Sequence, residues 1–150
     1  MIINPHPPLT SFPIALALLL VAFEVWVAAR RPSAAPVGEV RIFLVIALLL
    51  AVSAAYYSGF WGLEYAADPS MLRPLTEREA SDHQAFARVA LILSFPFALF
   101  GYLASARPQR ALRTVYFVCL MGLAMTLLWT GFQGGRLVFE RAAGVSKVAE

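Results

Sequence analysis

The sequence has few charged residues for its length of 150. Asp, Glu, Lys and Arg together make up 14% of the chain, about half of the share that is usual in soluble domains, and apolar residues make up 60%. A soluble domain of this size leaves about 30% of its surface exposed and needs polar side chains there. The composition therefore excludes a soluble globular domain and a disordered chain, and it predicts a membrane protein.

Cysteine and histidine are also scarce. The single cysteine, Cys119, excludes an internal disulfide, a cysteine-rich zinc site and the CxxCH attachment of a c-type haem. Only two histidines, His6 and His83, are present, and there is no hydrolase, phosphate-binding or dinucleotide-binding motif. We therefore expect no self-contained catalytic site of a soluble type.

What the sequence does contain is four apolar stretches, each close to the roughly 20 residues that a helix needs to cross a bilayer. They fill about half of the chain and leave no room for a second domain. We predict an all-α integral membrane protein, a four-helix up-down bundle forming one transmembrane domain over residues 1–150. The predicted spans cover residues 12–29, 42–62, 86–104 and 115–133.

The basic residues predict the orientation. They are dispersed along the chain, which argues against a nucleic-acid partner. Six lie in the first and third connections and six in the second connection and the tail, but the first and third connections are shorter and denser in charge. The positive-inside rule then places both termini outside. The first set is Arg30, Arg31, Arg41, Arg107, Arg110 and Arg113, and the second is Arg73, Arg78, Arg88, Arg136, Arg141 and Lys147.

The two histidines are expected at the same membrane face. Thr10 and Ser11 are good N-cap residues for the first helix, so His6 should lie just before it, and His83 should lie in the opening turn of the third helix. These two helices are diagonal partners in an up-down bundle, roughly 12–14 Å apart. Two imidazoles reaching inward across that diagonal have the spacing for bis-histidine ligation of a b-type haem. The alternative is a pair of ordinary interfacial histidines.

Glycines occur at the same end of the second and fourth spans. They are Gly59 and Gly62, and Gly131 and Gly135. Missing side chains there would let a flat macrocycle approach the backbone, nearby aromatics such as Trp61 and Trp129 would wall the pocket, and Arg136 would pair with a propionate. The alternative reading is small-residue helix packing, an aromatic belt and a solvated arginine.

Glu24 lies within the first apolar stretch, about 18 Å along the helix from its start. A carboxylate at this depth is unfavourable unless it faces the bundle interior, is protonated or finds a partner. One interpretation is a proton-handling group beside a quinone. The other is a structural carboxylate held by a hydrogen bond or by water near the rim.

Two segments resemble a bacterial family of predicted four-helix membrane proteins of unknown function. Residues 6–16 read HPPLTSFPIAL, similar to a family opening that has His-Pro and then His-Phe-Pro-Ile-Ala-Leu, and residues 134–140 read GGRLVFE, similar to its Gly-Gly-x-Leu-Val ending, with Gly144-Val145 following. Some members are found beside or fused to c-type cytochromes, so the resemblance implies a redox setting. One departure is Ser11, which stands where the family has a second histidine.

The function predicted on these grounds is that of a membrane electron-transfer subunit resembling a b-type cytochrome. It would hold haem b between His6 and His83 near the periplasmic face of a bacterial inner membrane. It would link a periplasmic c-type cytochrome or redox enzyme to quinone or to other membrane subunits, as a non-catalytic part of an oxidoreductase complex. The alternative is a cofactor-free scaffold or accessory subunit of a respiratory or photosynthetic complex.

Overall fold

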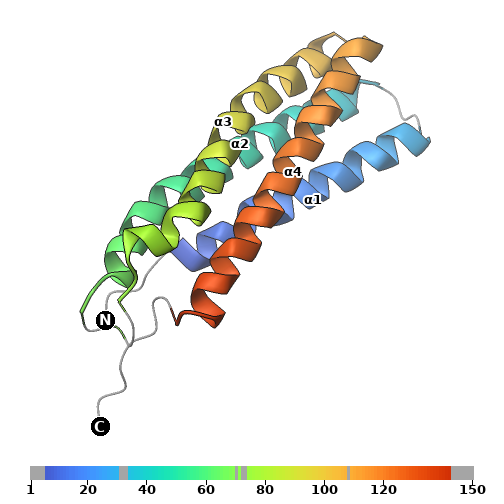
Figure 1. Ribbon diagram of the computed structural model, residues 1–150. Coiled ribbons are helices and arrows are strands. Elements are labelled where there is room, and N and C mark those ends of the chain that lie inside the picture. The colour runs from blue at the N-terminus through green and yellow to red at the C-terminus, as the bar shows by residue number, and fades with distance from the viewer. Residues whose placement is uncertain (1–5, 31–33, 70, 72–73, 108, 143–150) are drawn as a thin grey trace.

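The computed structural model describes residues 6–30, 34–69, 71, 74–107 and 109–142. Four long helices account for most of them, as Figure 1 shows. The bounds are His6–Arg30 for α1, Ala34–Ala66 for α2, Glu77–Ala106 for α3 and Arg110–Phe139 for α4. The all-helical prediction is confirmed, and each predicted span lies inside one of these helices.

All four helices extend beyond the predicted spans, because helical hydrogen bonding continues into the less apolar flanks. The prediction that α1 starts at Thr10 and Ser11 is wrong: the helix starts at His6. The two prolines that follow His6 are compatible with this start, since the first turn of a helix needs no backbone N–H donors. The extra turn carries His6 on the helix itself instead of on a loop.

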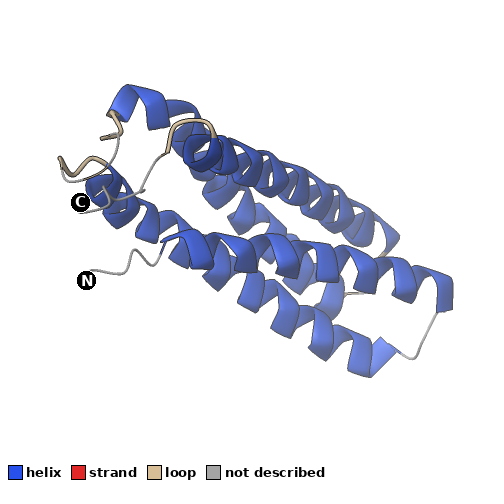
Figure 2. Ribbon diagram, turned by 90° about the horizontal axis from the view of Figure 1, so that it is seen from below, coloured by secondary structure: helices blue, strands red, loops and turns tan. Residues whose placement is uncertain are grey.

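The helices pack in a ring in which α1 and α3 are diagonal partners, as are α2 and α4. Each helix contacts two neighbours: α2 packs against α1 and α3, and α4 packs against α3 and α1. The α2–α3 connection lies at the end of the bundle where α1 begins and α4 ends, as both ribbon views show (Figures 1 and 2). The beginning of α3 is therefore brought to the same end as the beginning of α1.

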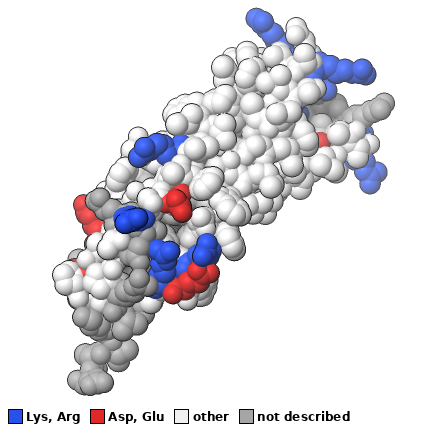
Figure 3. Space-filling model, viewed as in Figure 1, with Lys and Arg blue, Asp and Glu red and all other residues white. Residues whose placement is uncertain are grey.

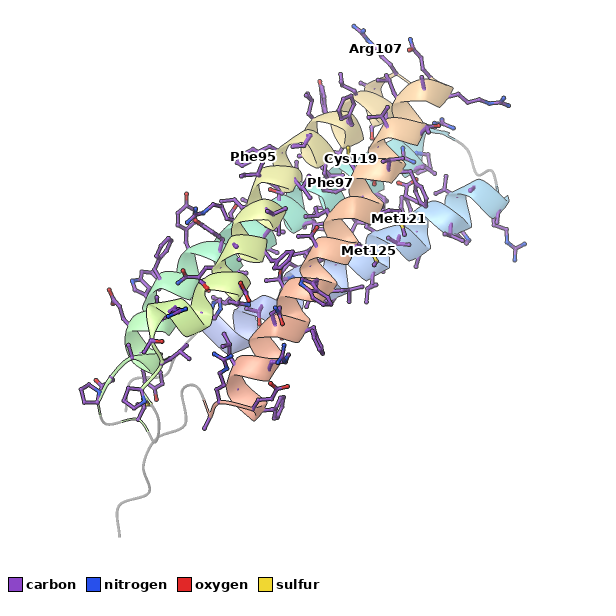
Figure 4. The ribbon with its side chains drawn as sticks, viewed as in Figure 1. Phe95, Phe97, Arg107, Cys119, Met121 and Met125 are labelled. Carbon is purple, nitrogen blue, oxygen red and sulfur yellow. The ribbon has the colours of Figure 1, made fainter. Side chains whose placement is uncertain are left out.

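The core is made by one stripe of apolar side chains from each helix. Leu20, Leu48, Phe97, Leu120 and Leu123 are all fully buried in it. The opposite faces of the helices are just as apolar but point outward; Phe95 and Phe97, two positions apart on α3, point to different sides of that helix in Figure 4. A helix that is apolar all round is typical of a membrane span.

The outer surface is the one a bilayer requires. All four helices are long and apolar enough to cross a membrane. Large apolar side chains on every helix are exposed, and on the face drawn in Figure 3 the charged side chains gather toward the two ends. Exposing so many large apolar side chains to water would be strongly unfavourable. The fold is thus consistent with a multi-pass membrane protein.

Glu24 and Arg41 form an ion pair between α1 and α2. Arg41 Nε donates to Glu24 Oε1 at 2.6 Å and Nη2 donates to Oε2 at 2.9 Å, so the guanidinium holds both carboxylate oxygens. Only 4% of the Arg41 side chain and 10% of the Glu24 side chain are exposed. The sequence reading placed Arg41 in a connection among orientation-setting charges. The structure corrects this, because α2 starts seven residues earlier, at Ala34, and draws Arg41 inward.

Aromatic rings complete the surroundings of this ion pair. The guanidinium carbon of Arg41 lies 5.7 Å from the centre of the Tyr116 ring, which itself stacks on Phe97 at 5.8 Å. The pair between α1 and α2 is therefore covered by Tyr116 of α4, which in turn packs on Phe97 of α3. Of the two interpretations of Glu24, the structure supplies the partner that the structural one needs. Whether Glu24 also handles protons stays a prediction.

The enclosed ion pair leads to a first prediction. Arg41→Ala should lower the free energy of unfolding by roughly 3–5 kcal/mol, because it leaves the Glu24 carboxylate buried and unpaired. A double variant, Arg41→Met with Glu24→Leu, should recover most of the loss by removing both charges. Thermal unfolding in detergent micelles measures both. The control is Arg136→Ala, which breaks the exposed pair with Glu140 and should leave the midpoint unchanged. Equal effects of Arg41→Ala and Arg136→Ala would contradict the prediction.

Candidate functional site

The two histidine rings meet at one end of the bundle. His6 opens α1 and His83 lies in the second turn of α3, and their ring centroids are 6.1 Å apart with the ring planes at 80°. These two helices are diagonal partners, and their described backbones do not pack directly against each other. The predicted convergence of the two imidazoles is therefore present in the structure.

Glycine backbone makes the approach possible. A Cβ added at Gly62 on α2 would lie 3.0 Å from His6 Cβ, and one added at Gly59 would lie 3.3 Å from His6 Cε1. On the opposite side, a Cβ at Gly134 on α4 would lie 3.1 Å from His83 Cε1. Each imidazole thus lies close to a helix at a glycine, and a Cβ there would require the ring to shift by a few tenths of an ångström.

Both rings are oriented by hydrogen bonds at Nδ1. His83 Nδ1 lies 3.1 Å from the carbonyl oxygen of Thr130, which can only accept, so Nδ1 carries the proton. His6 Nδ1 lies 2.9 Å from Ser58 Oγ, and Ser58 donates its own hydroxyl proton to the carbonyl oxygen of Ala55. The Ser58 oxygen is then the acceptor, and His6 Nδ1 is again the donor. In a neutral imidazole this leaves the lone pair on Nε2 in both rings.

The electrostatics at His6 favour the neutral ring. Burial lowers the pKa of His6 below its ordinary value of 6.5, and the charge of a protonated His83 lowers it further, while the carbonyl of Ala55 acts in the opposite direction. A metal ligand must be unprotonated, so this is the state that ligation requires.

A cavity of about 450 Å³ adjoins the two rings. Residues of all four helices line it, and most of them are small or apolar; its polar members include Thr10, Tyr56, Gln84 and Thr130. A separate apolar cluster of Ala66, Leu75 and Ala80 contributes to its wall where the α2–α3 connection folds back. Cavities of this size and character accept a cofactor or another small molecule.

All four predicted glycines, Gly59, Gly62, Gly131 and Gly135, line this cavity. Gly59 and Gly62 give space to the His6 ring, and Gly131 lies against Ile14, where a Cβ would come within 2.7 Å of Cδ1. These three glycines therefore make room for side chains of α1, and whether a macrocycle approaches their backbone stays a prediction. Gly135 has no atom near its missing Cβ and lines the cavity.

Arg136, Trp61 and Trp129 do not line the large cavity. Arg136 lies in the last turn of α4, about half exposed, and its Nε donates to both carboxylate oxygens of Glu140 at 3.0 Å. With His83 it lines a separate hollow of about 50 Å³. Trp61 and Trp129 are exposed and do not line the large cavity. They match the belt interpretation because their helix positions face away from the bundle axis.

Sequence reasoning missed the residues that orient the rings. Ser58 stands out only as a serine in an apolar helix next to Gly59, Thr130 acts through its backbone carbonyl, and Gly134 was passed over for its neighbour. A serine, a threonine or a glycine in an apolar helix is informative only when the side chain that it contacts on another helix is already known. Arg31, Arg73, Lys147 and the pair Gly144-Val145 lie outside the described residues.

Comparison of the chain with models of protein families, with curated proteins and with solved structures finds no match.

The close approach of His6 to Gly62 leads to a second prediction. Gly62→Ala should destabilise the protein by about 1–3 kcal/mol, because its Cβ overlaps His6, even though alanine is the better helix former. Gly135→Ala is the matched control, with nothing near its new Cβ, and should be neutral or slightly stabilising. Unfolding midpoints in micelles decide between them. If both variants shift the midpoint in the same direction, the space that Gly62 leaves for His6 is not needed for stability.

The lowered pKa of His6 leads to a third prediction. A histidine whose pKa is lower in the folded state contributes stability above pH 6.5, and this contribution is lost as the pH falls through the folded pKa. The free energy of unfolding should therefore fall on acidification below 6.5. The fall should be smaller in His6→Gln, which cannot titrate. Identical pH profiles for the two proteins would refute the assignment of this effect to His6.

Proposed function

We propose that the protein is a membrane-embedded b-type cytochrome subunit that holds one haem through His6 and His83. The observation that carries the proposal is the meeting of the two rings at 6.1 Å, with both Nδ1 atoms committed to acceptors. Bound haem would supply a one-electron carrier whose potential its axial ligands and buried surroundings set. The resemblance to a family some of whose members are found beside or fused to c-type cytochromes supports the same proposal.

The ring separation fits the proposed ligation. Two iron–nitrogen bonds of about 2 Å, with the distance from each nitrogen to the centre of its ring added, give centroids roughly 6 Å apart. The observed separation is 6.1 Å. The hydrogen bonds at Nδ1 are the arrangement by which proteins orient metal-bound histidines, since they leave Nε2 as the ligating atom. The adjoining cavity of about 450 Å³ offers space for the macrocycle among apolar side chains.

The ligand count favours haem over a bare metal ion. A structural zinc site uses four protein ligands and a catalytic one uses three. Among the described residues no group of three or more His, Cys, Asp and Glu side chains is placed to hold a metal. Porphyrin brings four nitrogens of its own, so two imidazoles complete the coordination of its iron.

The proposed setting is a bacterial inner membrane, crossed four times in alternating directions. The end opposite the histidines carries exposed Arg30, Arg107, Arg110 and Arg113, with Glu39 as its counter-charge among the described residues there. By the positive-inside rule that end faces the cytoplasm. The histidine end is then periplasmic and carries charged residues of both signs. It would dock a c-type cytochrome or another redox partner. Quinone or a larger complex would be the second partner. Arg136, beside His83, is the proposed partner of a haem propionate.

The visible spectrum of the full chain, purified in detergent from a haem-producing bacterium, tests the proposal. We expect a reduced-minus-oxidised difference spectrum of the b type with about one haem per chain. His6→Ala and His83→Ala should each lower the haem content at least tenfold, because each removes an axial ligand.

Tyr56→Phe is the control for this experiment. It alters the cavity lining without touching an imidazole, so its haem content should equal that of the unaltered chain. A haem-free wild type, or full haem content in both alanine variants, would overturn the cytochrome proposal. A haem-free chain recovered inside an intact membrane complex would favour the cofactor-free scaffold instead.

A further inference from the structure

Ser58 is the buried polar residue closest to the proposed ligands, and only 2% of it is exposed. Its hydroxyl donates to the Ala55 carbonyl at 2.9 Å, which leaves its oxygen to accept from His6 Nδ1, 2.9 Å away. A serine in a helix can satisfy its hydroxyl by donating to a carbonyl three or four residues earlier. The second bond, across to α1, is therefore additional to what the helix itself requires.

We infer that Ser58 is a positioning residue that sets the tautomer and the basicity of His6 as a haem ligand. The inference rests on the proposed function. By accepting the Nδ1 proton, the Ser58 oxygen keeps the lone pair on Nε2 and raises its basicity toward a metal. Without Ser58, the ring would lose this restraint on its rotation and on the choice of tautomer.

The two proposed ligands are held unequally. Each ring has a backbone carbonyl beside it, Thr130 for His83 and Ala55 for His6, but among the described hydrogen bonds only His6 also has a side-chain hydroxyl at Nδ1, that of Ser58. His6 is thus the ligand whose properties a single substitution in α2 changes. The haem potential and affinity should respond to residue 58 for the same reason.

Ser94 provides a matched control. It is fully buried on α3, and its hydroxyl donates to the Leu91 carbonyl three residues earlier, as that of Ser58 does to Ala55. It has no contact with either imidazole among the described hydrogen bonds. Ser58→Ala and Ser94→Ala therefore remove the same group from the same kind of helix position, and they differ in the bond to His6.

Haem titration of the purified full chain, a redox titration of the bound haem and ¹⁵N NMR of labelled histidine test the inference. Ser58→Ala should weaken haem binding about 10–100-fold and raise the midpoint potential, because a less basic ligand stabilises ferric iron less. Ser58→Cys, whose sulfur accepts weakly, should lie between serine and alanine. In the haem-free wild type the NMR should show the proton on His6 Nδ1, and in Ser58→Ala a mixture of tautomers.

The outcomes separate this inference from the function on which it rests. If the wild type binds haem and Ser58→Ala matches Ser94→Ala within about threefold in affinity, with an unchanged potential, Ser58 has no positioning role and the cytochrome proposal stands. If the wild type binds no haem, both fall. A His6 ring protonated on Nε2 in the haem-free protein also overturns the role of Ser58, whatever the spectrum shows.

Discussion

The contact between His6 and His83 is the interaction on which the proposed site depends. It joins two diagonal helices whose described backbones do not pack directly against each other, and glycines on the neighbouring helices leave space for the two rings. Gly62 and Gly134 let the rings lie against backbone, and Ser58 and the Thr130 carbonyl fix their rotation. Without the glycines or without the hydrogen bonds at Nδ1, the two histidine rings at this end of the bundle would not be held facing each other.

A second polar cluster stabilises the other half of the bundle. Glu24 and Arg41 neutralise each other among apolar side chains, and Tyr116 covers the guanidinium. Nineteen of the apolar residues in the described chain are buried, while many larger ones face outward. In a bilayer the hydrophobic effect does not decide which face of such a helix turns inward, because lipid tails are as apolar as the bundle interior. Directional contacts such as this ion pair therefore help to fix the rotation and register of α1 against α2.

The four helices and the end of the bundle that holds both histidines were predictable, because neither depends on which side chains meet between helices. The four spans needed only the length and continuity of apolar residues, and the common end of His6 and His83 followed from the alternation of helix direction. The partner of Glu24 did not follow, since Arg41 reads as a flanking charge until α2 is seen to begin at Ala34. The closeness of Gly59 and Gly62 to His6 did not follow either, because the sequence shows a missing side chain and not what occupies its space.

The amino-acid sequence by itself determined the class of structure. Sixty per cent apolar residues and four long apolar runs favour long helices, which satisfy their backbone hydrogen bonds internally and are consistent with a multi-pass membrane protein. The tertiary structure alone decided which side chains meet: that His6 lies against α2 and His83 against α4, that Ser58 accepts from one ring, and that Arg41 turns inward to Glu24. The physical reason is that helix rotation and register are set by contacts between distant segments, whereas apolar helices of this kind carry no amphipathic pattern that would announce them.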